Sequence, residues 1–168
     1  MGFATLEIQH GREYALLHIV LVEPEIPSNT GNISRTCSVT GAVLHLVRPL
    51  GFSTDDKQLK RAGLDYWNML DIRYHDSIFE LWDKHPDGRF FYIETTGKKS
   101  YAEVSYQEND FLVFGKETKG LAQEILDRSP ENIVRIPIRQ GARSLNLSNA
   151  VAIVAFEAYR QLGFPQMV

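Results

Sequence analysis

The stretch LHIVLVEPEIPSNTGNISRTCSVTGAVLHLV, residues 17–47, decides the fold. It opens with the short run Leu17–Val22, which is apolar except for His18 and is typical of a strand buried on both faces of a sheet. Residues 24–29 contain two prolines and predict a loop, and residues 32–40 predict a helix. Val43–Val47 is short and apolar and predicts a second strand. The order strand, helix, strand indicates an α/β fold with a parallel sheet.

The same alternation continues along the rest of the chain. Further strands are predicted at Phe90–Ile93, 111–114 and 133–136, and further helices at 56–62, 77–84, 121–128 and 146–162. Asp76 is the expected N-cap of the helix at 77–84. Together these elements predict one α/β domain, residues 16–168, with a mostly parallel sheet and helices on both faces. Residues 1–15 are more polar and form a predicted N-terminal extension.

Composition places the chain among ordinary globular proteins. It has 168 residues, of which 43% are hydrophobic, and its formal net charge is −3 because 18 Lys and Arg stand against 21 Asp and Glu. This excludes a disordered chain and a generally basic nucleic-acid binder. Cys37 is the one cysteine, so no intramolecular disulfide can form, and a cytoplasmic location is expected. No apolar run approaches the length of a membrane helix.

Two of the loops that follow predicted strands are unusually polar or glycine-rich. In an open α/β sheet, ligands bind at the carboxyl ends of strands, where such loops gather. Residues 28–36, SNTGNISRT, carry Asn29 and Arg35; one interpretation is that Asn29 or Ser28 only caps the helix and Arg35 is a solvated charge. Residues 114–121, FGKETKGL, carry Gly115 and Glu117; a plain glycine turn with a capping acid is the alternative there.

The third such loop gives the strongest sign of a binding site. Residues 143–149, RSLNLSN, hold five polar side chains just where the long apolar helix begins. One serine or asparagine is enough to cap a helix, so the surplus points to a ligand.

Other chemistries find no support in the residues. The five histidines show no metal-ligand spacing and one cysteine cannot build a zinc site, so we expect no metal. His18 and His45 lie within predicted strands and are expected to be hydrogen-bonded core residues. Cys37 is expected to be a small buried side chain. The chain has no Gly-x-Gly-x-x-Gly dinucleotide motif and no Gly-x-Ser-x-Gly nucleophile elbow.

Taken in order, the segments NTGNISRT (29–36), FGKE with GL (114–121) and RSLNLSNA (143–150) resemble the three motifs of the SpoU-type RNA 2′-O-methyltransferases of the SPOUT superfamily. The likeness covers about residues 17–165 and is greatest to the small single-domain members that methylate the wobble nucleotide of tRNA. It implies a C-terminal trefoil knot, a homodimer, S-adenosylmethionine as cofactor and tRNA as the substrate partner. The alternatives are a SpoU-type enzyme acting at another tRNA or rRNA site, and a non-catalytic RNA-binding relic of the fold.

The resemblance also assigns expected roles to residues. The methyl donor is expected to contact Ile93, Thr95, Gly115, Glu117, Ile136, Ser144, Leu145 and Asn149. Arg35, Ser144, Asn146, Glu117 and Asn29 form the expected catalytic set. In it, Arg35 binds a phosphate and polarises the ribose 2′-hydroxyl, because a guanidinium stays protonated and is a poor base. The chain departs from the family pattern in having Glu94 directly after Ile93, where Thr or Ser is more usual.

RNA binding by an acidic chain requires a locally positive surface. Lys57, Lys60 and Arg61 would share one face of the short helix at 56–62. Arg139 and Arg143 lie in the loop before the last helix. Phosphate contacts depend on local charge, so these five residues are the expected RNA-binding groups.

Overall fold

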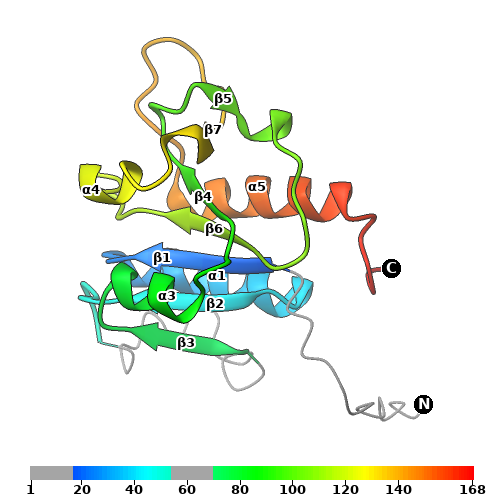
Figure 1. Cartoon of the computed structure of the whole chain (residues 1–168), viewed down its shortest axis with the longest axis horizontal. Coiled ribbons are helices and arrows are strands. Elements are labelled where there is room, and N and C mark those ends of the chain that lie inside the picture. The colour runs from blue at the N-terminus through cyan, green and yellow to red at the C-terminus, as the bar shows by residue number, and fades with distance from the viewer. Residues whose placement is uncertain (1–16, 54–69) are drawn as a thin grey trace.

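The computed structural model describes residues 17–53 and 70–168. These residues form a seven-stranded sheet in the order β3-β2-β1-β6-β4-β7-β5, in which all strand pairs are parallel (Figure 1). The strands are β1 (Leu17–Val22), β2 (Val43–Val47), β3 (Ile72–His75), β4 (Phe90–Ile93), β5 (Lys99–Ser100), β6 (Asp110–Phe114) and β7 (Ile133–Arg135). The helices are α1 (Pro27–Thr40), α3 (Ile78–Lys84), α4 (Gln123–Leu126) and α5 (Leu147–Gln161), with short 3-10 turns at Tyr101–Glu103 and Pro130–Asn132.

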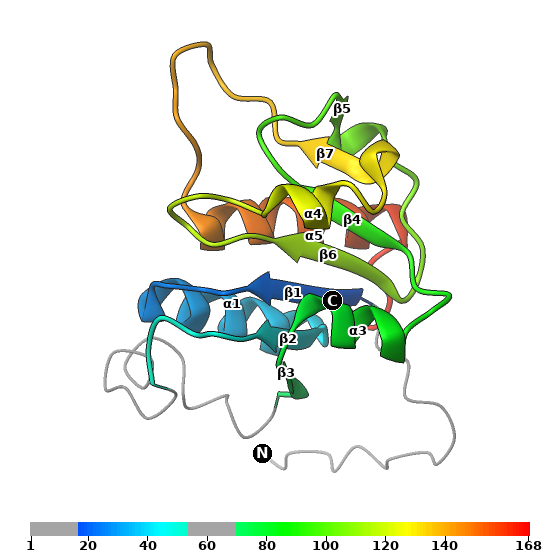
Figure 2. The same ribbon diagram turned by 60° about the vertical axis from the view of Figure 1, so that its left-hand side comes forward.

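Helices cover both faces of the sheet, as predicted. Alternate residues of β1 point to opposite faces. Leu17, Ile19 and Leu21 pack with α1 and α5, whereas Val20 and Val22 pack with α3 and α4. The two views agree that α1 and α5 lie on one side and α3 and α4 on the other (Figures 1 and 2). The central strands are therefore buried on both faces, which explains why their sequences are apolar at nearly every position.

The starts of α1 and α3 differ from their predictions. The predicted loop at 24–29 is partly helix, because α1 begins at Pro27 rather than at residue 32. Proline suits the first helical position, where no backbone N–H is needed. The N-cap of α3 is Ser77, whose Oγ accepts a hydrogen bond from the Glu80 N–H at 3.2 Å, and not Asp76. The carboxylate of Asp76 instead pairs with Arg48 at 2.8 Å.

The structure also contains strands that the sequence pattern did not predict. β3 includes Arg73, Tyr74 and His75 and is mostly half-buried, so it lacks an apolar run. β5 has only two residues.

The helix predicted at 121–128 is reduced to α4. The helix predicted at 56–62 and the extension at 1–15 lie outside the described residues. Among the helices at 17–53 and 70–168, none has the length and apolar character needed to span a membrane.

Three histidines form a hydrogen-bonded row inside the sheet. His18, His45 and His75 come from the adjacent strands β1, β2 and β3. His18 Nδ1 lies 2.9 Å from His45 Nε2, and His45 Nδ1 lies 2.9 Å from His75 Nε2. The His18 ring also stacks on Phe111, with 4.1 Å between ring centroids. The expectation that His18 and His45 are satisfied core residues is confirmed. Cys37 is also buried as expected, and burial raises the pKa of its thiol to about 12.

Acid is expected to destabilise the fold through this row. Burial lowers the pKa of His18 to about 4 and that of His45 to about 2, from the ordinary 6.5. Below pH 6.5 the unfolded chain therefore binds protons that the folded chain excludes, and stability falls as the pH drops toward 4. Burial raises the pKa of Asp110 to about 6, which opposes part of this loss. We expect a net loss of roughly 3 kcal/mol in unfolding free energy between pH 7 and pH 4.

Urea unfolding followed by circular dichroism at several pH values measures this loss. His18→Phe keeps an aromatic ring against Phe111 and removes one titrating group, so its stability is expected to depend less steeply on pH. An unfolding free energy that is the same at pH 7 and pH 4.5 would contradict the expectation.

Candidate functional site

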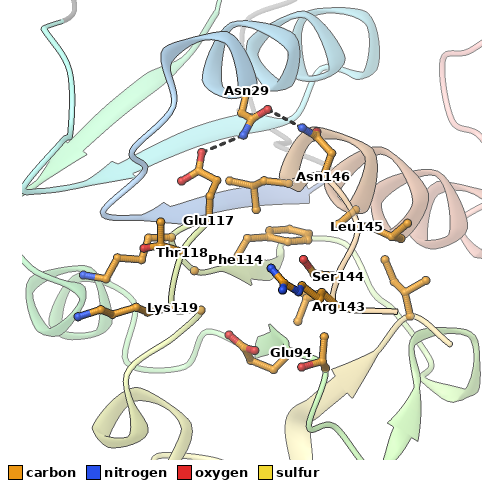
Figure 3. Close-up of a pocket in the computed structure, with 18 of the residues that line it drawn as sticks. Asn29, Glu94, Phe114, Glu117, Thr118, Lys119, Arg143, Ser144, Leu145 and Asn146 are labelled. Carbon is orange, nitrogen blue, oxygen red and sulfur yellow. Dashed lines mark hydrogen bonds between the residues drawn. The ribbon is translucent and has the colours of Figure 1, made fainter. Parts of the chain in front are cut away.

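A cavity of about 660 Å³ lies where the loops after β4, β6 and β7 meet the start of α5 (Figure 3). These strands are neighbours and parallel, so their carboxyl ends share one edge of the sheet. The lining residues that come from the three polar segments of the sequence include Asn29, Gly115, Glu117, Ser144 and Asn146. The structure thus brings together residues that are more than 100 positions apart in the chain.

Glu117 caps α1 from a distant part of the chain. Its carboxylate accepts hydrogen bonds from the backbone N–H groups of Glu25 at 2.9 Å and Ile26 at 3.2 Å. It also accepts one from Asn29 Nδ2 at 3.0 Å. The N-cap residue of α1 is Ile26, which has no capping side chain of its own. A carboxylate at this end of a helix meets unsatisfied N–H groups and the positive end of the helix dipole.

Two asparagines extend this contact to α5. Asn146 Nδ2 donates to Asn29 Oδ1 at 2.9 Å. Asn146 Oδ1 accepts from the N–H of Ser148 at 2.9 Å and from its hydroxyl at 2.7 Å, which caps α5. The chain Glu117–Asn29–Asn146 therefore connects all three polar segments (Figure 3). The interpretation that Asn29 or Ser28 merely caps α1 is wrong, because both lie inside the helix and its N-cap residue is Ile26.

The loop after β6 is held close to the start of α1. Thr118 Oγ1 donates to the Glu25 carboxylate at 2.8 Å, and Lys116 forms an ion pair with Glu23. Gly115 lines the cavity, as expected. A side chain at this position would collide with the backbone of the same loop. A Cβ at Gly115 would lie 2.4 Å from the backbone carbon of Gly120. Gly115 is thus required for the loop to fold back on itself.

Most of the predicted site residues line the cavity. They are Asn29, Ile93, Thr95, Gly115, Glu117, Ile136, Arg143, Ser144, Leu145 and Asn146. Asn149 is exposed and is not among the lining residues, although its N–H bonds to Asn146 Oδ1 at 3.4 Å. Arg35 is exposed on α1 and lies outside the lining as well. Lys57, Lys60 and Arg61 lie outside the described residues.

A second cavity of about 380 Å³ adjoins the first and is lined by arginines. Arg139 and Arg143 were expected in a basic loop, and Arg135, which the sequence did not single out, lies with them. No acidic residue occurs between Glu131 and Glu157, so the charge of this loop is uncompensated along the sequence. The segment between β7 and α5 projects from the body of the molecule (Figure 2).

Glu94 also lines the cavity, although sequence reasoning did not assign it to the site. It follows β4 and its Oε1 accepts a hydrogen bond from the Leu121 N–H at 2.5 Å. Burial raises the pKa of its carboxyl group. The only signal in the sequence was the acidic residue at a position where Thr or Ser is more usual.

The first cavity has the character of a site for an organic ligand with an apolar part. Several of its lining side chains are apolar yet partly exposed, including Leu145 at 39% and Ile138 at 37%. Such walls suit a flat heterocycle, while the surrounding carboxylates, amides and backbone groups suit its polar substituents. Within 17–53 and 70–168, no group of three or more His, Cys, Asp or Glu side chains is placed to hold a metal ion.

The fold and this site define the class of protein. The family model of the SpoU rRNA Methylase family matches residues 16–156, and the chain belongs to that family. Similar proteins include the tRNA (cytidine(34)-2′-O)-methyltransferases of Escherichia coli K12 and Yersinia pestis. The first is 51% identical over 155 residues, covering 91% of this chain and 98% of that protein. The second is 51% identical over 156 residues, covering 89% and 96%.

Solved structures agree with these relatives. One, described as giving insight into the 2-OH methylation of C/U34 on tRNA, has a TM-score of 0.84 and 47% identity, and the match covers 88% of this chain and 96% of that one. The S-adenosylmethionine-bound rRNA methyltransferase of Sinorhizobium meliloti has a TM-score of 0.77 and 28% identity. That match covers 89% of this chain and 58% of the other.

Proposed function

We propose that this chain is an S-adenosylmethionine-dependent tRNA 2′-O-methyltransferase that acts on the ribose of nucleotide 34, a cytidine or uridine. The observation that carries the proposal is the Glu117–Asn29–Asn146 chain, which joins the three family motifs around one cavity. The names of relatives with about half of their residues identical over nearly their whole length support the substrate.

The first cavity is the proposed donor site. S-adenosylmethionine, when bound, supplies a methyl group on a positively charged sulfur that a ribose hydroxyl can attack. Ile136 and Leu145 supply apolar walls for the adenosine part, and Ile93, Thr95 and Gly115 present backbone at the strand ends. Ser144 and Asn146 lie where they can orient the reacting groups. The protein's main contribution is to position the reactants, because transfer from a sulfonium neutralises charge instead of creating it.

We propose that a trefoil knot and a homodimer complete the enzyme. The family resemblance supports the knot, and the segment at 143–147 lines the same cavity as the loop after β6. The dimer is supported by apolar side chains that are exposed on the two helices of this side of the sheet: Val39 (62% exposed) on α1, and Ile153 (37%) and Phe156 (44%) on α5. Arg35 is one turn from Val39 on α1, so a second copy docked there would bring Arg35 into the interface.

The arginine-lined cavity is the proposed path of the RNA backbone. Arg135, Arg139 and Arg143 surround it, and Arg143 also lines the donor cavity, which joins the two sites. Arginine matches phosphate groups in geometry as well as charge. Lys57, Lys60 and Arg61 remain predicted contacts. A tRNA substrate also supports the expected cytoplasmic location.

Methylation of purified tRNA by the purified protein tests the function. With S-adenosylmethionine carrying a labelled methyl group, we expect label on tRNA, and nuclease mapping should place it on the 2′-oxygen of nucleotide 34. Label at another tRNA position, or on rRNA, would support the alternative SpoU-type specificity. Binding of RNA without any transfer would support the non-catalytic relic.

A further inference from the structure

The position of Glu94 is fixed by the backbone around it. Its N–H donates to the Val134 carbonyl at 2.9 Å, and its carbonyl accepts from the Gly97 N–H at 3.2 Å. Gly97 has no room for a side chain, since a Cβ there would lie 2.5 Å from the backbone carbon of Val134. The turn after β4 therefore fixes the backbone of Glu94 at the lining of the cavity.

The carboxylate of Glu94 is also held in place. Oε1 accepts the Leu121 N–H, and the carboxylate fills the space beside Gly120, where a Cβ would lie 2.4 Å from Oε1. Two nearby acids are already engaged: Glu117, which also lines the cavity, accepts from three N–H donors, and Glu23 pairs with the lining residue Lys116. No ion pair of Glu94 occurs within the described parts of the chain, and burial raises the pKa of its carboxyl.

We propose that Glu94 makes the cavity selective for the positively charged methyl donor over the neutral product of its own reaction. This inference rests on the proposed function. In the reaction the ribose oxygen bonds to the methyl carbon, the carbon–sulfur electron pair stays on sulfur, and the hydroxyl proton is lost to water or phosphate. S-adenosylmethionine thereby becomes S-adenosylhomocysteine, which has lost one positive charge and one methyl group.

The positive charge on the sulfur is what distinguishes the donor from the product for a charged residue of the cavity. Donor and product share the adenosine, the amine and the carboxylate, so contacts with those groups largely cancel in the ratio of their dissociation constants. A cavity of about 660 Å³ is of the size that a single small molecule fills. Glu94 lines this cavity, so its charge acts on a ligand bound there.

The other charged groups around the cavity determine how strongly the charge of Glu94 affects the ligand. Arg143 and Lys119 also line the cavity and disfavour a cationic ligand (Figure 3). The negative charge of Glu117 is largely compensated by the N–H groups at the start of α1. Glu94 accepts hydrogen bonds from fewer groups, the backbone N–H groups of Leu121 and Thr95, so more of its charge acts on the ligand.

Calorimetric titration with three ligands tests the proposal without turnover. The ligands are S-adenosylmethionine, S-adenosylhomocysteine and sinefungin, an analogue that carries a protonated amine in place of the methylsulfonium. Glu94→Gln keeps the shape and the acceptor for Leu121 but removes the charge. We expect it to raise the dissociation constants of both cationic ligands roughly five- to tenfold more than that of S-adenosylhomocysteine. Glu94→Thr, which restores the more usual residue, should change the ratio in the same direction.

The matched control is a carboxylate outside the cavity. Glu108→Gln removes an exposed carboxylate outside the cavity and should leave the ratio unchanged. Thermal melting verifies that each variant is folded, and if Glu94→Gln is not, Glu94→Thr carries the comparison. An unchanged ratio in a folded Glu94 variant overturns the selectivity proposal. Failure of the unmodified protein to bind any of the three ligands would instead overturn the proposed function.

Discussion

Replacement of Arg35 by alanine is expected to lower the rate of methyl transfer by roughly 10²- to 10⁴-fold, the usual range for a group that assists proton removal. The fold should be unaffected, because Arg35 is exposed on α1 and the core lies on the opposite side of that helix. Donor affinity should also be nearly unchanged, since Arg35 does not line the cavity of its own chain. In the proposed homodimer, Arg35 acts at the interface on the RNA hydroxyl.

Single-turnover methylation of tRNA measures this effect, with calorimetry for donor binding and thermal melting for stability. Arg35→Lys keeps the charge but loses the planar fork and should recover only part of the rate. Lys84→Ala, which removes an exposed cation from α3 on the other side of the sheet, is the matched control. Normal turnover by Arg35→Ala would rule out the assigned role.

Replacement of Glu117 by glutamine is expected to weaken both the fold and the donor site. The substitution removes the charge and turns one acceptor into a donor, facing the N–H groups of Glu25 and Ile26 and the amide of Asn29. A lost charged hydrogen bond with an unsatisfied partner costs about 2–3 kcal/mol. For a chain of this length, that corresponds to a fall in Tm of about 4–12 °C. Donor affinity should fall as well, because three cavity segments share this anchor.

Glu25→Gln is the matched control for Glu117→Gln. Glu25 also bonds to the loop after β6, through Thr118, but that contact is exposed. Exposed contacts contribute little, so its Tm should change by only about 1–2 °C. Melting curves and donor titrations of the two variants can be compared directly. Equal, small effects for both would show that Glu117 does not organise the cavity.

The parts of the fold that the sequence predicted are those whose environment is local or uniform. Leu17–Val22, Val43–Val47 and Phe90–Ile93 are strands with the predicted limits, because a strand buried on both faces needs an apolar residue at nearly every position. α5 also agrees with its prediction, since its apolar stripe and its own capping residue, Asn146, lie within one segment. The resemblance to SpoU enzymes, which matched motifs instead of periodicity, correctly indicated the family.

The start of α1 was missed for a physical reason. Its N-cap, Ile26, is a residue type that rarely caps helices, and the groups that satisfy its first N–H donors belong to Glu117. That carboxylate is 91 residues from Ile26 in the chain, so no local pattern could indicate it. The same holds for β3, whose half-buried residues depend on pairing with β2.

The sequence by itself determined the alternation of buried strands and helices, the three polar segments and, through them, the family. Those features depend on neighbours within about one helical turn or one strand. Only the tertiary structure decided that Glu117, Asn29 and Asn146 form one hydrogen-bonded chain, that Arg35 lies outside the cavity, and that Glu94 lines it. Directional hydrogen bonds and charge interactions act over a few ångströms in space, whatever the separation along the chain, and the parallel sheet sets those distances.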